Sequence, residues 1–151
     1  MFDRGQGGGV ELRLSRDERS LLGGLVAELR ALLDGAPGDP SLRRLFPPAY
    51  DEAEDERAYR DLMGGELLDG RRAALDVVAQ TVDREQLDAE EADAWLRALN
   101  DLRLVLGTRL DVQEDTFAEE LRRDDPRAPA LAVYGYLSWM QEELIGALSP
   151  D

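Results

Sequence analysis

The 151-residue sequence contains no cysteine, no histidine and no lysine, and all 18 of its basic residues are arginine. The missing cysteine and histidine exclude disulfides, thiol nucleophiles, Ser-His-Asp triads and metal sites built on thiolate or imidazole. The missing lysine excludes Schiff-base catalysis and the phosphate-binding lysine of P-loops. These absences predict a protein that is not an enzyme, with no catalytic residues, no metal site and no cofactor.

Acidic residues outnumber basic ones by 33 to 18, which gives a formal net charge of −15. The excess lies in residues 51–151, because residues 1–50 hold seven acids and seven arginines. A negative field repels phosphate backbones and anionic lipid, so direct DNA binding is expected to be weak or indirect, with no membrane contact. The sequence has no apolar run of about 20 residues and no apolar leader, so a cytoplasmic location is predicted.

The first 14 residues predict a short β-hairpin. Residues 1–4 form one strand, a glycine-rich loop spans 5–9, and residues 10–14 alternate apolar and charged side chains with the period of a half-buried strand. A two-stranded hairpin is marginal alone. It must therefore pack on helices or pair its free edge with another chain, and the second case leaves a homodimer as an alternative.

Residues 15–151 predict helices, so the fold class is mainly α: a single-domain bundle over 1–151 with five to six helices after the 1–14 hairpin. Ser15 with Glu18, and Asp88 with Glu91, have the spacing of capping boxes. A short helix is predicted at 41–45, one kinked helix or two helices over 59–82, and a last helix starting at 125–126. Ala79 is expected on an apolar stripe within 59–82, and Ile145 on the inner face of the last helix. We interpret Gly23-Gly24, inside the first helix, as a site of close helix packing.

Two groups of charged residues are candidates for chemistry. Helix-borne carboxylates at three-residue spacing, such as Glu90-x-x-Asp93, can hold Mg²⁺ together with the acids at 51–56, as in all-helical nucleotide pyrophosphohydrolases. The favoured interpretation is structural, because acids stabilise the first turn of any helix. Arginine pairs bind carboxylate or phosphate at two points, but most are expected to pair within this acidic chain, with Arg43-Arg44 as the exception.

Two stretches carry a resemblance that covers essentially the whole chain: residues 39–47, Asp-Pro-Ser-Leu-Arg-Arg-Leu-Phe-Pro, and residues 95–110, from Trp95 to Leu110. With Tyr136-Leu137-Ser138-Trp139, they resemble an actinobacterial family of oxidative stress transcriptional regulators, long labelled a domain of unknown function. The resemblance implies a cytoplasmic helical regulator that acts through an extracytoplasmic-function sigma factor and RNA polymerase. It also implies redox sensing through a cysteine pair, which this chain does not have.

The leading hypothesis is thus a non-enzymatic transcriptional regulator that contacts a sigma factor or RNA polymerase through protein–protein binding in a stress response. The alternatives are the Mg²⁺-dependent pyrophosphohydrolase and an adaptor or accessory protein of Clp proteolysis, the latter suggested by the gene neighbourhood of the family. The predicted partner-binding residues are polar or basic side chains: Arg43, Arg44, Asn100, Arg103, Thr108 and Arg109.

Overall fold

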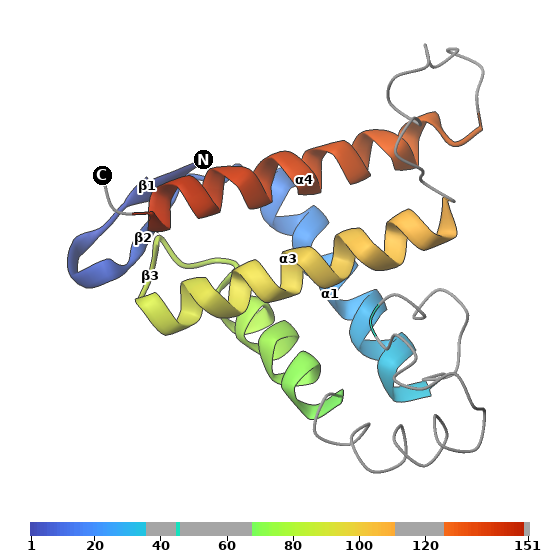
Figure 1. The fold of residues 1–151 in the computed structure, drawn as a ribbon, viewed down its shortest axis with the longest axis horizontal. Helices are drawn as coiled ribbons and strands as arrows, with labels where there is room; N and C mark the ends of the chain where they lie inside the picture. Colours follow the sequence, from blue (N-terminus) through green and yellow to red (C-terminus); the bar gives the residue numbers. More distant parts are fainter. Residues whose placement is uncertain (36–44, 46–67, 111–125, 150–151) are drawn as a thin grey trace, which may run out of the picture.

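The computed structural model describes residues 1–35, 45, 68–110 and 126–149. These residues form a mainly helical fold with a small antiparallel sheet (Figure 1). The helical class is confirmed, but the described part holds four helices rather than five or six: α1 (Arg16–Gly35), residues 68–81, α3 (Ala89–Arg109) and α4 (Ala128–Leu148). The helix predicted at 41–45 and the helical stripe over 59–67 lie outside the described residues, except for Leu45, a buried turn residue.

The sheet has three strands in the order β1-β2-β3, so the two-stranded prediction is corrected. β1 (Phe2–Arg4) pairs antiparallel with β2 (Val10–Leu12), and β3 (Gln86–Leu87) pairs with the other edge of β2. A two-residue strand is too short to show the alternation by which strands are recognised. Because β2 lies between two partners, it has no free edge for another chain.

The turn of the hairpin needs glycine at two positions. Gly7 and Gly8 have φ values of 65° and 83°, in the region that side chains with a Cβ rarely adopt. The loop closes with a hydrogen bond from the Gly5 amide to the Gly9 carbonyl, at 2.9 Å. The glycine-rich loop 5–9 is therefore a structural turn that sets the register of β1 against β2.

Both predicted capping boxes are present. The Ser15 amide donates to Glu18 at 2.9 Å and the Glu18 amide to the Ser15 hydroxyl at 3.1 Å. At α3, the same exchange between Asp88 and Glu91 has distances of 2.9 and 2.8 Å. The last helix differs from its prediction: it begins at Ala128 without a side-chain cap, and a proline in its first turn supplies the helical φ.

Helices α3 and α4 lie side by side and run in opposite directions, while α1 crosses them and the sheet covers one end (Figure 1). Trp95 of α3 is fully buried where the helices meet the sheet. Its ring is nearly perpendicular to that of Phe2, with the two centroids 6.2 Å apart, and its indole N–H donates to the Thr81 hydroxyl at 2.7 Å. One side chain thus joins β1, α3 and the end of helix 68–81.

Three details of the predicted packing are wrong. A Cβ added at Gly23 or Gly24 would meet no atom within 4 Å, so these glycines do not serve close helix packing. Ala79 and Ile145, expected on inner faces, are exposed. In each case the sequence pattern correctly predicted a helix. Which of its residues are buried depends on neighbours that are distant in sequence.

Candidate partner-binding surface

Helix α4 differs from the other long helices in its charge content. Only two of its 21 residues are charged, Glu142 and Glu143, against seven of 20 in α1 and seven of 21 in α3. A surface helix normally carries charged residues opposite its apolar stripe. A helix with so few charged residues is expected in a buried position, yet one side of α4 faces solvent.

The inner side of α4 is part of the core, since Leu137, Met140 and Leu144 are fully buried. The opposite side carries Trp139, whose residue surface is 49% exposed. Ile145 is also exposed, at 45%, but points in another direction around the helix. We define the α4 outer face as the residues that share this direction on the helix: Ala132, Gly135, Trp139, Glu142, Glu143 and Gly146. Apart from two acids, this face offers apolar side chains and bare backbone.

Tyr136 anchors the α4 outer face to α1. Its hydroxyl donates a hydrogen bond to the Glu18 carboxylate, which also belongs to the α1 capping box. Its ring lies 6.1 Å from that of Trp139, at an interplanar angle of 56°. Burial, and then the neighbouring carboxylate, raise the pKa of Tyr136 well above its ordinary value. Tyr136 thus joins α4 to the start of α1 and lies against the ring of Trp139.

The Glu18 carboxylate stays ionised at this contact. The hydrogen bond from the Ser15 backbone, followed by that from Tyr136, holds the pKa of Glu18 below its ordinary value. A carboxylate that accepts two charge-assisted hydrogen bonds is strongly oriented. The hydrogen bond between Tyr136 and Glu18 therefore joins α4 to α1 in one orientation at neutral pH.

The predicted residues in the middle of α3 face the neighbouring helix. Arg103 donates to the Asn100 side-chain oxygen at 3.2 Å, and the Gln141 amide of α4 approaches the same oxygen at 3.5 Å. The Nε of Arg103 and the Oε1 of Gln141 are buried without a hydrogen-bond partner. The hydroxyl of Thr108 donates back to the Leu104 carbonyl at 2.9 Å. The structure thus places Asn100 and Arg103 together, in the α3–α4 contact.

The remaining predicted residues are separate from that pair. Arg109, at the end of α3, lies with Glu28 at a narrow groove of about 60 Å³ lined by leucine and valine side chains of α1 and α3. Ligand pockets typically have volumes of about 300–1,000 Å³, so this groove is too small for a cofactor. Arg43 and Arg44 lie outside the described residues. Partner contact through any of the six stays a prediction.

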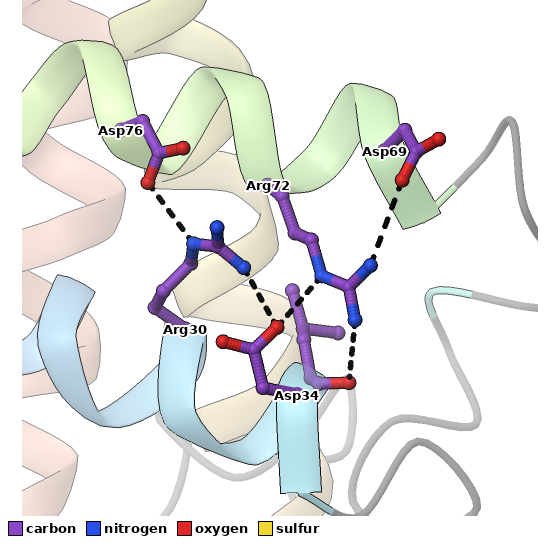
Figure 2. A network of polar contacts seen from close by, with 6 residues as sticks. Arg30, Asp34, Asp69, Arg72 and Asp76 are labelled. Atoms are coloured by element: carbon purple, nitrogen blue, oxygen red, sulfur yellow. Dashed lines mark hydrogen bonds and ion pairs between the residues drawn. The ribbon is translucent and has the colours of Figure 1, made fainter.

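A second group of arginines joins the end of α1 to helix 68–81. Figure 2 shows Arg30 bonded to Asp34 at 2.8 Å and to Asp76 at 3.0 Å. Arg72 contacts the same Asp34 oxygen at 2.8 Å and Asp69 at 3.5 Å (Figure 2). The expected pairing of arginines within the chain is confirmed for these two, and it connects elements about 40 residues apart.

A buried ion pair lies deeper in the same region. Arg71 donates to the Asp101 carboxylate and, at 2.8 Å, to the Leu45 carbonyl. Burial raises the pKa of Asp101, and the contacts with Arg71 oppose that rise. The partner of Asp101 therefore comes from a different helix, 30 residues earlier in the chain.

The carboxylates proposed for Mg²⁺ do not converge within the described residues. Asp93 pairs with Arg97 at 3.0 Å, and Glu90 is an exposed residue of the first turn of α3. No group of three acidic side chains that could hold a metal is present in the described ranges, and the acids at 51–56 lie outside them. Among the same residues, no helix combines the length and apolar character that a membrane crossing requires.

Comparison with known proteins identifies the family. The family model described as "Domain of unknown function (DUF2017)" matches residues 1–148. The chain belongs to the DUF2017 family. This confirms the resemblance found in the residue 39–47 and 95–110 motifs.

Curated relatives of this DUF2017 chain are mycobacterial. The "Oxidative stress regulator AosR" of Mycobacterium tuberculosis strain H37Rv is 36% identical over 127 residues, which cover 72% of this chain and 58% of the relative. The "Putative oxidative stress regulator AosR" of Mycobacterium leprae is 32% identical over 130 residues, covering 74% of this chain and 59% of the relative. The chain therefore spans less than two thirds of their length. No solved structure gives a significant match.

Proposed function

We propose that this DUF2017 chain is a non-enzymatic regulator of transcription that binds a sigma factor or RNA polymerase in a stress response. The names of its relatives support a regulatory role, since both are described as oxidative stress regulators. The observation that carries the proposal is the α4 outer face, where an apolar surface around Trp139 lies in contact with solvent. Exposed aromatic side chains are enriched where proteins bind proteins.

Charge supports a protein partner over a nucleic acid. A chain of net charge −15 gains no favourable encounter with phosphates. Several described arginines are already paired with acids of the same chain, as at Arg30, Arg72 and Arg97. A basic protein surface, in contrast, attracts this chain over long range, with an association rate that falls as salt rises.

A cysteine-based redox switch cannot lie within these 151 residues. The 151 residues contain no cysteine, so no disulfide can form within them. We propose that a stress signal reaches this chain through the concentration or state of its partner. Oxidant treatment of the purified chain is then expected to leave its affinity for the partner unchanged.

The test is direct binding of the purified chain to purified sigma factors and RNA polymerase from the same organism, at low and high salt. Binding to at least one of them, weaker at high salt, is expected. Run-off transcription with and without the chain then measures regulation. A chain that binds neither component and changes no transcript contradicts the proposal. Release of pyrophosphate from nucleotides with Mg²⁺ would then favour the alternative, a nucleotide pyrophosphohydrolase.

A further inference from the structure

We propose that the α4 outer face docks against an amphipathic helix of the partner protein, one that presents apolar residues flanked by arginine or lysine. This inference rests on the proposed function and names the surface and the chemistry of the partner. It starts from the exposed Trp139, the two acids beside it and the spacing of the residues around them.

The spacing on α4 is that of a helix-packing seam. Ala132, Gly135, Trp139, Glu142 and Gly146 follow one another at intervals of three, four, three and four residues. Positions with this spacing form one stripe along a helix, and two helices pack through such stripes. The stripe has one large residue in its middle and small residues toward both ends. A partner helix can approach the backbone closely there while Trp139 inserts between its side chains.

The glycines of this stripe have no packing role within the described structure. A Cβ at Gly135 or at Gly146 would meet no atom within 4 Å. Glycine inside a helix costs about 1 kcal/mol relative to alanine, a cost that close approach of a second helix offsets. Gly23 and Gly24 of α1 have the same open space, so this observation shows only that a second helix could approach α4 here. The exposure of Trp139 and the two acids beside it carry the proposal.

Charge selects the kind of partner. Glu142 and Glu143 are exposed, and no described residue forms an ion pair with either. A second copy of this chain carries the same net charge of −15 and is repelled. Anionic lipid would meet the same repulsion. Basic side chains on a partner helix satisfy the acids, and its apolar side chains cover Trp139.

The chain offers its own optical reporter for this contact. It has two tryptophans, of which Trp95 is fully buried and Trp139 is half exposed. Acrylamide quenching of tryptophan fluorescence therefore reports mainly on Trp139. The probes are a synthetic amphipathic leucine–lysine helix and a leucine–glutamate helix of the same length. The basic helix is expected to bind and to protect Trp139 from quenching, and the acidic helix is not.

Charge reversal separates a local site from overall attraction. The double variant Glu142→Arg/Glu143→Arg is expected to bind the leucine–lysine helix with an affinity at least about tenfold lower than wild type. Asp83→Arg with Glu85→Arg is the matched control: it reverses two exposed acids on another surface, changes net charge equally, and is expected to alter binding less than about twofold. Equal losses in the two variants overturn the proposal, as does binding that leaves Trp139 open to the quencher.

Two further measurements exclude other occupants and separate this inference from the proposed function. The proposal is overturned if the chain self-associates in sedimentation equilibrium and Trp139 is protected from the quencher in that associated state. It is also overturned if anionic vesicles protect Trp139. Trp139→Ser, checked for an unchanged helical spectrum, is expected to abolish capture of the sigma factor or polymerase that binds wild type. If wild type binds and this variant binds equally, the inference fails alone. If wild type binds neither component, the proposed function fails.

Discussion

The Arg71–Asp101 ion pair allows a prediction in which two substitutions at one contact have unequal costs. The side chain of Asp101 is 4% exposed, whereas that of Arg71 is 25% exposed and also donates to the Leu45 carbonyl at 2.8 Å. Arg71→Met therefore leaves a carboxylate buried without its cation. Asp101→Asn leaves a cation that still reaches water and an amide oxygen that still accepts its hydrogen bond.

Removal of the cation is expected to cost about 3–5 kcal/mol in the free energy of unfolding, the range for one broken partner of a buried pair. At this chain length, 1 kcal/mol moves Tm by about 2–4 °C, so Arg71→Met is expected to lower Tm by roughly 6–20 °C. Asp101→Asn replaces a charge-assisted hydrogen bond by a neutral one, with an expected loss of about 1–2 kcal/mol.

The pH dependence follows from the raised pKa of Asp101. Burial lifts this pKa above its ordinary value of 3.8, and the contacts with Arg71 hold it down in part. In Arg71→Met the folded-state pKa rises further, so the folded state binds the proton more tightly than the unfolded chain does. The stability of this variant is then highest below the unfolded pKa and falls as pH rises through the folded pKa. Its deficit relative to wild type is expected to shrink from neutral pH toward acid.

Urea unfolding of wild type, both single variants and Arg71→Met/Asp101→Leu, at neutral and mildly acidic pH, measures these differences. The double variant is expected to recover most of the stability lost in Arg71→Met, because a buried pair replaced by apolar side chains is often neutral. The reasoning is refuted if the two single variants lose equal stability at neutral pH and the gap between them does not change in acid.

Three smaller effects are expected from other contacts. Tyr136→Phe loses a hydrogen bond to the ionised Glu18 and is expected to lower the free energy of unfolding by about 1 kcal/mol near neutral pH. The difference from wild type is expected to shrink as pH falls through the lowered pKa of Glu18, because the carboxylate is then protonated, and melting curves over pH measure it. Asp34→Ala removes the acid shared by two arginines (Figure 2) and is expected to cost about 1 kcal/mol or less, with little effect left in 1 M salt; melting with and without salt checks it. Gly23→Ala and Gly24→Ala are each expected to raise stability by up to about 1 kcal/mol, since the added Cβ meets no atom; a decrease in Tm would show that something packs there.

Local features of the fold were predictable from the sequence. A capping box depends on residues three apart, so Ser15 with Glu18 and Asp88 with Glu91 indicated the starts of α1 and α3 correctly. The alternation in residues 10–14 likewise indicated β2. These features are set by side chains and backbone groups that are neighbours in sequence.

Features that depend on distant neighbours were not predictable. β3 exists because Leu87 pairs with Val10, 77 positions earlier in the chain. Asp101 is satisfied by Arg71 from another helix, a partner that no local spacing indicates. The direction of Ile145 depends on how α4 lies on α3 and β1, so its helical period placed it on the wrong side.

The candidate site shows the same division for a chemical reason. Sequence reasoning sought the partner contact mainly among the arginines, because the guanidinium group binds carboxylate or phosphate at two points. In a chain with 33 acids, however, folding brings carboxylates to arginines such as Arg30 and Arg72, and the α3 network directs Arg103 toward Asn100. An arginine that is paired within the chain has to lose that pair before it can bind elsewhere, which reduces the net gain. Exposed Trp139 loses only water on binding, and the acids beside it have no described ion pair to lose. A face with few charges therefore has less to lose on binding than a paired arginine does, and among the described residues this supports the outer face of α4 as the proposed contact.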